Sequence, residues 1–199
     1  MSGKKVFTIY TPTNSIEADW LMDQGDYEGA IKELQKCLKN QTDPESRLFI
    51  LKDLGYCYSR LNWLKEAVES FDQYLKGNPF DNDARFFRAS AYASLKWTDE
   101  AIKELRIILA LDPNDVLAQH DLALCYRDKG WRKESLNEMR KANDSAGMYG
   151  NADEQKIVAS SLSHIEDETN KGDDRFIAGF LVYIMLLLQM KRKMKGLYK

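Results

Sequence analysis

The side chains that most often carry chemistry are few in this chain and poorly spaced for it. There are two histidines, His120 and His164, and three cysteines, Cys37, Cys57 and Cys125. His120 precedes Cys125 by five residues, which gives too few ligands at a poor spacing for zinc. No G-x-S-x-G, H-E-x-x-H, C-x-x-C or Gly-rich phosphate loop occurs. The sequence therefore predicts no catalytic, metal or cofactor site, and a protein that is not an enzyme.

Composition narrows the class of partner and the compartment. The 199 residues are 44% hydrophobic and 30% charged, with a net charge of −2. Acidic and basic residues are mixed, which lacks the basic footprint of a nucleic-acid binder, so no nucleic-acid partner is expected. An odd number of cysteines without C-x-x-C favours reduced thiols in a cytoplasmic compartment. Residues 1–12 are predicted to be a lead-in, because Val6 to Tyr10 is too short for a signal-peptide core.

A 34-residue period organises the middle of the chain, from Leu48 to Asp115. The positions that repeat are Tyr58, Tyr92 and Tyr126; Trp63, Trp97 and Trp131; Ala67, Ala101 and Ser135; and Phe71, Leu105 and Met139. Within a period, apolar residues recur at steps of three and four, which predicts two amphipathic helices. A break at Asn62-Trp63 separates the two helices, and Asn78-Pro79 ends the second. A fixed period of this length indicates an array of stacked helical hairpins.

These residues resemble the tetratricopeptide repeat (TPR), a helix-turn-helix unit of the same length. The resemblance implies an all-α fold, a right-handed superhelical solenoid of about four repeats. It covers residues 13–145 and is best over 48–145, with a weaker first repeat whose first helix, around Ser15 to Gln24, is short. In this family, small residues such as Gly55 and Ala67 mark the contact between the two helices of a unit. The tryptophans that recur in the turns are expected to pack onto adjacent repeats.

The region after the repeats is predicted to contain two further helices. Asp144 to Asn151 is interpreted as a loop, and 152–168 as a capping helix with a narrow apolar stripe. Thr169 to Asp174 is predicted to be a second loop. A very apolar helix with a basic tail is then expected over 174–195.

The apolar stretch Phe176 to Met190 has no polar face, and it leaves two interpretations open. A helix that is apolar on every side lies inside protein or inside a membrane. Its fifteen residues fall between a buried helix and a full membrane span. It is either the second helix of a divergent fifth hairpin, covered by protein or by a second chain, or a C-terminal membrane anchor.

The resemblance implies that partner proteins bind in a concave groove lined by the first helix of each hairpin. Helical phase places nine residues on that face, at positions expected to be exposed: Phe49, Lys52, Tyr56, Arg60, Phe86, Ser90, His120, Leu124 and Arg127. Some family members grip the carboxylate tails of heat-shock chaperones with a Lys-x-x-x-Asn arrangement, which is absent here because Tyr56 follows Lys52. An apolar or aromatic peptide flanked by charges is expected instead.

The function predicted from these observations is a protein–protein interaction scaffold or adaptor that holds a partner peptide or helix. Two alternatives remain open at this stage. One is a TPR adaptor or assembly factor attached by Phe176–Met190 to a membrane facing the cytosol. The other is a chaperone-like protein that holds an apolar segment of a client. Self-association through the same apolar segment is a further expectation.

Overall fold

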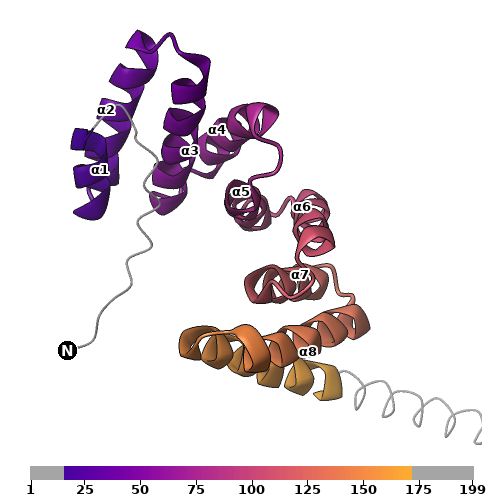
Figure 1. Ribbon diagram of the computed structural model, residues 1–199. Coiled ribbons are helices and arrows are strands. Elements are labelled where there is room, and N and C mark those ends of the chain that lie inside the picture. Colours follow the sequence, from indigo (N-terminus) through magenta and orange to yellow (C-terminus); the bar gives the residue numbers. More distant parts are fainter. Residues whose placement is uncertain (1–15, 172–199) are drawn as a thin grey trace, which may run out of the picture. The chain divides into compact units, whose positions relative to one another are not determined.

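A computed structural model describes residues 16–171, which form α-helices and connecting turns without a strand (Figure 1). The predicted all-α helical-repeat class is therefore confirmed. The chain divides into two compact units, Met1–Pro113 and Asn114–Lys199, and each is described by itself. The predicted lead-in, 1–12, and the predicted apolar helix, 174–195, lie outside the described residues.

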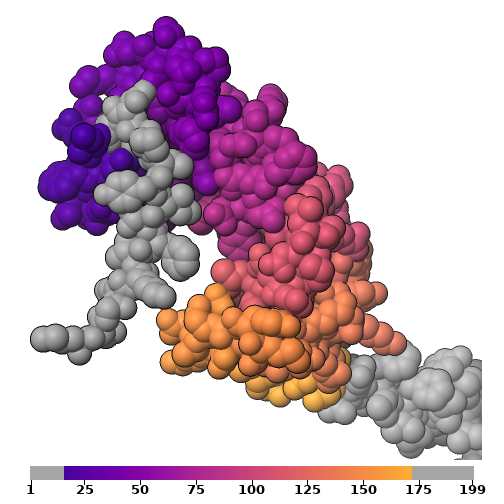
Figure 2. All heavy atoms as spheres, viewed as in Figure 1, coloured from indigo at the N-terminus to yellow at the C-terminus, as the bar shows by residue number. Residues whose placement is uncertain are grey.

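The first unit contains three helical hairpins in sequence. Their helices are α1 (Ile16–Asp23), α2 (Tyr27–Asn40), α3 (Pro44–Arg60), α4 (Leu64–Gly77), α5 (Asn82–Ser94) and α6 (Thr98–Leu111). Each hairpin also packs against the next, through α2 with α3 and through α4 with α5. The space-filling view shows this unit, from indigo to pink, as a continuous close-packed body (Figure 2). This stacking buries apolar faces that a single hairpin would leave exposed.

The second unit contains one hairpin and the helical segment after it. The hairpin consists of α7 (Val116–Asp128) and α8 (Arg132–Tyr149), and residues 152–171 are also helical. Val158 and Ile165 of the last segment are buried against Met139 and Ala142 of α8. The segment 152–171 thus covers the apolar side of the α7–α8 hairpin.

The beginnings of the first helices are fixed by aspartates. Asp43, Asp81 and Asp115 each accept a hydrogen bond from the backbone N–H three residues later, at 2.7–2.9 Å. This satisfies one of the N–H groups that a helix start leaves unpaired. Pro44 follows Asp43 at the first helical position, where its missing N–H costs nothing.

All four hairpin turns have the same backbone geometry. In the second hairpin, the Trp63 N–H donates to the Tyr58 carbonyl and the Asn62 N–H donates to the Ser59 carbonyl. This pair of bonds is a Schellman motif, which requires one residue in the left-handed region. The residues with positive φ at this place are Gly25 (77°), Asn62 (60°), Lys96 (63°) and Gly130 (76°). Two of the four turns therefore adopt this conformation without glycine.

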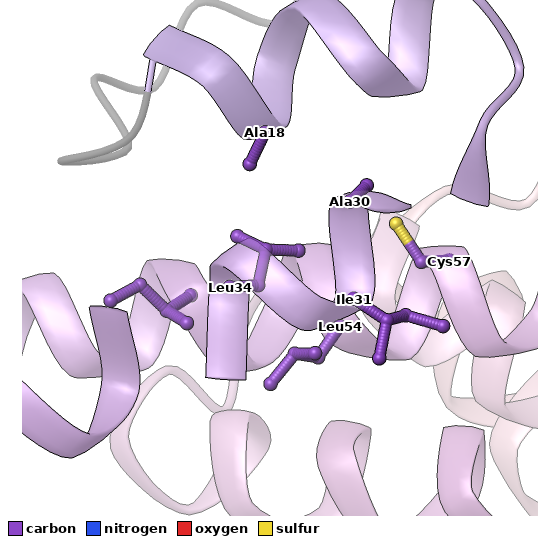
Figure 3. Packing of buried hydrophobic residues seen from close by; sticks show 7 residues of the cluster. Ala18, Ala30, Ile31, Leu34, Leu54 and Cys57 are labelled. Carbon is purple, nitrogen blue, oxygen red and sulfur yellow. The ribbon is translucent and has the colours of Figure 1, made fainter. Parts of the chain in front are cut away.

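The first core cluster lies between α1, α2 and α3. Figure 3 shows Ala18, Ala30, Leu34 and Cys57 directed into this shared interior, where all four side chains are fully buried. Only small side chains on α1 and α2 allow the short first helix to approach this closely. The weak first repeat is therefore a complete hairpin.

The small residues in each hairpin make room for particular neighbours. A Cβ added at Gly55 would lie 2.7 Å from Cε1 of Phe71, so glycine is required there by the phenylalanine one helix away. Ser135 stands where the earlier hairpins have alanine, and it is fully buried. Its hydroxyl donates to the Ala123 carbonyl at 2.8 Å, which satisfies the polar group that the substitution introduces.

Two predicted loops are wrong. Residues 144–149 belong to α8, because Ser145 and Ala146 are buried and Ala146 packs in the core of the second unit. The loop predicted from Thr169 onward is helical at least to residue 171. Local glycines and capping residues indicated turns in both places, but burial of one helix face decided the outcome.

The tryptophans of the turns lie against tyrosines within their own hairpins, and their packing onto adjacent repeats stays a prediction. Each lies against the tyrosine five residues earlier, in the first helix of its own hairpin. The ring pairs are Tyr58–Trp63 (5.9 Å between centroids), Tyr92–Trp97 (5.8 Å) and Tyr126–Trp131 (5.6 Å). The Schellman turn folds the chain back on itself and so brings the two rings together. The tryptophans remain exposed on their outer side.

Candidate functional site

One side of α3 and α5 carries four of the predicted groove residues, Phe49, Tyr56, Phe86 and Ser90. This side is here called the first-helix face, and it contains a row of aromatic rings. The aromatic row comprises Tyr27, Tyr56, Phe87 and Phe86. Neighbouring ring centroids are 6.1, 5.6 and 6.2 Å apart, and each pair meets edge to face. All four side chains are half-buried. The row runs from α2 across α3 to α5, and it leaves partly exposed aromatic surface in the first unit.

The aromatic row is held from below by the core. Phe87 stacks on Phe71, with ring centroids 6.1 Å apart and planes within 10°. Phe71 is fully buried between α4 and its neighbours. Rings fixed in this way lose little side-chain freedom on binding, which favours their use as anchors for a partner.

The remaining predicted residues on α3 and α5 differ in their surroundings. Phe49 is half-buried and Ser90 is exposed. Arg60 is exposed, and its guanidinium lies 5.2 Å from the centroid of the Tyr27 ring. This distance suits a cation–π contact at the end of the aromatic row.

Lys52 is engaged within the fold. Its Nζ lies 2.7 Å from a carboxylate oxygen of Asp81, and both side chains are largely buried. The Tyr74 hydroxyl donates to the same oxygen at 2.6 Å. These bonds and the N-cap of α5 keep the pKa of Asp81 below its ordinary value, against the opposing effect of burial. Lys52 therefore fixes α3 to the start of α5.

Asp53, which the sequence analysis did not select, lies on the same side of α3. It is separated from Phe49 by four residues and from Tyr56 by three, so the three side chains share one helix face. Its Oδ2 is buried and has no hydrogen-bond partner in the described part of the chain. Burial, and secondarily the carboxylate of Asp19 on α1, raises the pKa of Asp53 to about 7. Lys52 opposes this shift.

The three predicted residues on α7 belong to the second unit, and one of them is misplaced. His120 is 8% exposed, so its predicted exposure is wrong. Its Nε2 lies 3.0 Å from the Ser161 hydroxyl, because the helical segment 152–171 covers this side of α7. Leu124 is half-buried against the same core, and Arg127 is half-buried beside Asp128.

Two hollows on the described surface lie away from the first-helix face. One, of about 420 Å³, has an almost wholly apolar lining; its residues are Pro79, Phe80, Arg85, Arg106, Ile107, Ala110 and Leu111. The other, of about 330 Å³, is lined by polar residues of α2, from Lys32 to Asn40. Neither hollow is lined by a residue of the aromatic row.

The metal-ligating side chains of the described residues do not gather into one group. Residues 16–171 contain no group of three or more metal-ligating side chains. None of the three cysteines forms a disulfide in this part of the chain, and burial raises the pKa of the Cys57 thiol to about 12. Among the described helices, none is long and apolar enough to cross a membrane, and Phe176–Met190 lies outside them.

Comparison with known proteins agrees with this architecture. Profiles described as tetratricopeptide repeat match residues 18–44 and 52–116. A crystal structure of MamA is similar, with a TM-score of 0.60 and 20% identity, over 79% of this chain and 98% of that one. MamA 41-end from Desulfovibrio magneticus RS-1 gives 0.59 and 22%, over 78% and 93%. At this identity the likenesses establish the fold alone. No curated protein sequence matches the chain.

Proposed function

The chain is a tetratricopeptide repeat protein, and from this premise we propose that it binds a partner peptide or helix on the first-helix face of α3 and α5. Repeats of this family serve protein–protein interaction, in general as scaffolds without catalytic activity. The observation that carries the proposal is the aromatic row. Half-buried aromatic rings that are fixed from below, beside exposed Arg60 and Ser90, have the character of an interaction surface.

The alternative proposals differ in the kind of ligand that the protein binds and in its location in the cell. A chaperone-like holder of an apolar client segment would use the same rings. Attachment to a membrane or to a second copy through Phe176–Met190 stays a proposal about residues outside the described part. A cytoplasmic location is proposed because an odd number of cysteines without a C-x-x-C motif favours reduced thiols.

The proposal is tested by affinity capture from a native lysate, followed by titration of the captured partner in purified form. Tyr56→Ala and Phe86→Ala are each expected to raise the dissociation constant for the partner at least tenfold, while the far-UV circular dichroism spectrum stays unchanged. Truncating an interface anchor costs about 2 kcal/mol or more, which is about 30-fold in the dissociation constant and exceeds the tenfold limit set here. Phe80→Ala is the matched control, because Phe80 is an exposed aromatic residue away from the face. Equal affinity of all three variants and the unmodified chain would refute the assignment.

A further inference from the structure

The partner's chemistry is indicated by Asp53, a carboxylate beside the aromatic row whose Oδ2 has no hydrogen-bond partner among the described residues. This step rests on the proposed function, since it concerns the same face. We infer that Asp53 and the aromatic row together select a peptide that carries a lysine or arginine next to an apolar or aromatic residue. The described part of the chain supplies the rings and the carboxylate, and such a peptide supplies the cation.

Asp53 lies on the first-helix face of α3. It stands one helical turn from both Phe49 and Tyr56, and Tyr56 meets Tyr27 edge to face at 6.1 Å. A ligand side chain that reaches Asp53 therefore passes beside tyrosine rings. Tyrosine faces attract cations, and Arg60 already lies 5.2 Å from the Tyr27 ring. The Tyr27 ring is therefore already occupied by Arg60, and a basic ligand side chain is favoured by the Asp53 carboxylate.

The described side chains leave the Asp53 carboxylate without an ion-pair partner. Its Oδ2 is buried without a hydrogen-bond partner among the described residues, and such a group costs free energy unless something pairs with it. The nearest cation by sequence, Lys52, is bound to Asp81 at 2.7 Å. Asp19 of α1 adds a second negative charge instead of a positive one.

The groups around Asp53 explain the protonation state that a ligand meets. Asp19 from α1 disfavours the ionisation of Asp53, and Lys52 on α3 favours it. Besides burial, the charge of Asp53 in turn raises the pKa of Cys57 and of Tyr74. Burial is the largest effect, and the pKa of Asp53 lies at about 7. A cationic ligand binds the ionised form, so binding must tighten as pH rises through 7.

Selection from a random library of 12-residue peptides displayed on phage tests the inference on the full-length chain. The unmodified chain is expected to enrich peptides with Lys or Arg within two positions of an apolar or aromatic residue. Asp53→Asn should keep the apolar preference and lose the basic enrichment at least fivefold. Glu69→Gln, which changes an exposed carboxylate on α4, should select as the unmodified chain does. Identical basic enrichment by Asp53→Asn would overturn the inference.

Two further outcomes separate this inference from the proposal on which it rests. If Tyr56→Ala enriches the same peptides as the unmodified chain, or no peptide is enriched at all, the face itself is wrongly assigned. If Tyr56→Ala abolishes enrichment but the unmodified chain selects no basic residue, only the inference about Asp53 fails.

The pH dependence of one selected peptide without histidine gives an independent readout. With a pKa of about 7 in the free protein and ionisation on binding, the dissociation constant should be about tenfold lower at pH 8 than at pH 6. Asp53→Asn should bind equally at both pH values. A pH-independent dissociation constant of the unmodified chain would also overturn the inference.

Discussion

The first helices α3 and α7 occupy the same place in their hairpins, but different elements of the chain contact their outer faces. On α3, Tyr56 and Asp53 remain at least partly open, and aromatic rings of α2 and α5 extend the surface. On α7, His120 is buried and lies against Ser161 of the segment 152–171. His120 lies two repeats after Lys52, which is also largely buried, so this position is closed in both helices. On α3 it is closed through the ion pair with Asp81, and on α7 through the covering segment 152–171.

The largest expected effect tests whether the segment 152–171 is what closes the second unit. Ile165→Ala removes a side chain that is 2% exposed in that unit's core, which should cost about 2–5 kcal/mol. Hydrogen exchange should show lost protection in α7 and α8, with α3 and α4 unchanged. Ile157→Ala, on the same helix but 50% exposed, is the control and should change little. Equal loss in both units would contradict two separate cores.

A smaller effect tests how the two units pack their hairpins. Gly55→Ala places a Cβ against Phe71, which is held by Phe87, and should destabilise by about 1–3 kcal/mol in urea unfolding. The corresponding places in the second unit hold Ala123 and Met139, whose flexible thioether adapts.

The clash between the added Cβ and Phe71 should be relieved by the methionine that the second unit has at the equivalent position. Combining Gly55→Ala with Phe71→Met should cost less than the sum of the two single changes, by about 1 kcal/mol. Strict additivity would show that the glycine serves some other purpose than room for the ring.

The open face should also make stability depend on pH. Asp53 has a folded-state pKa of about 7, above its unfolded value, so the folded chain binds more protons between the two values. Stability should therefore fall as pH rises from 5 to 8. Asp53→Asn removes this loss and should stabilise the chain at pH 8 by roughly 1–2 kcal/mol, and by little at pH 5. Thermal melts at the two pH values measure it, and a variant that gains equally at both would exclude this cause.

The smallest effect concerns what the two units share, the turn with one left-handed residue. Lys96→Gly should stabilise the chain by about 0.5–1 kcal/mol, because φ is +63° there and glycine adopts it without a Cβ penalty. Gly130→Ala should destabilise by about 1 kcal/mol for the converse reason. Urea unfolding measures both, and effects of the same sign would show that the turn conformation is not the determinant.

The periodic residues predicted the hairpins well, because the helices and turns of a hairpin are determined by residues close together in the sequence. The break at Asn62-Trp63 lies between the end of α3 at Arg60 and the start of α4 at Leu64. The weak first repeat also forms two helices, α1 and α2, although its spacing to the next hairpin differs by three residues. Steps of three and four, together with Asp caps, carry this information without any knowledge of distant contacts.

Residues whose role depends on distant neighbours escaped prediction. Tyr27 belongs to the aromatic row, but it comes from a second helix and from the shifted first repeat. Asp53 was not selected, since nothing in the sequence indicates that its Oδ2 is buried or that Asp19 acts on its carboxylate. His120 was misplaced because the helix that covers it begins only at residue 152. The residues on the first-helix face itself stay a prediction.

The tryptophans give this chain an optical label in each of its four described hairpins. Its four tryptophans are Trp20, Trp63, Trp97 and Trp131, one for each hairpin from α1–α2 to α7–α8. The last three lie against a tyrosine of their own first helix and stay partly exposed, so their emission senses only that hairpin's turn. Three single-tryptophan versions would therefore report, without an added dye, the order in which the repeats come apart.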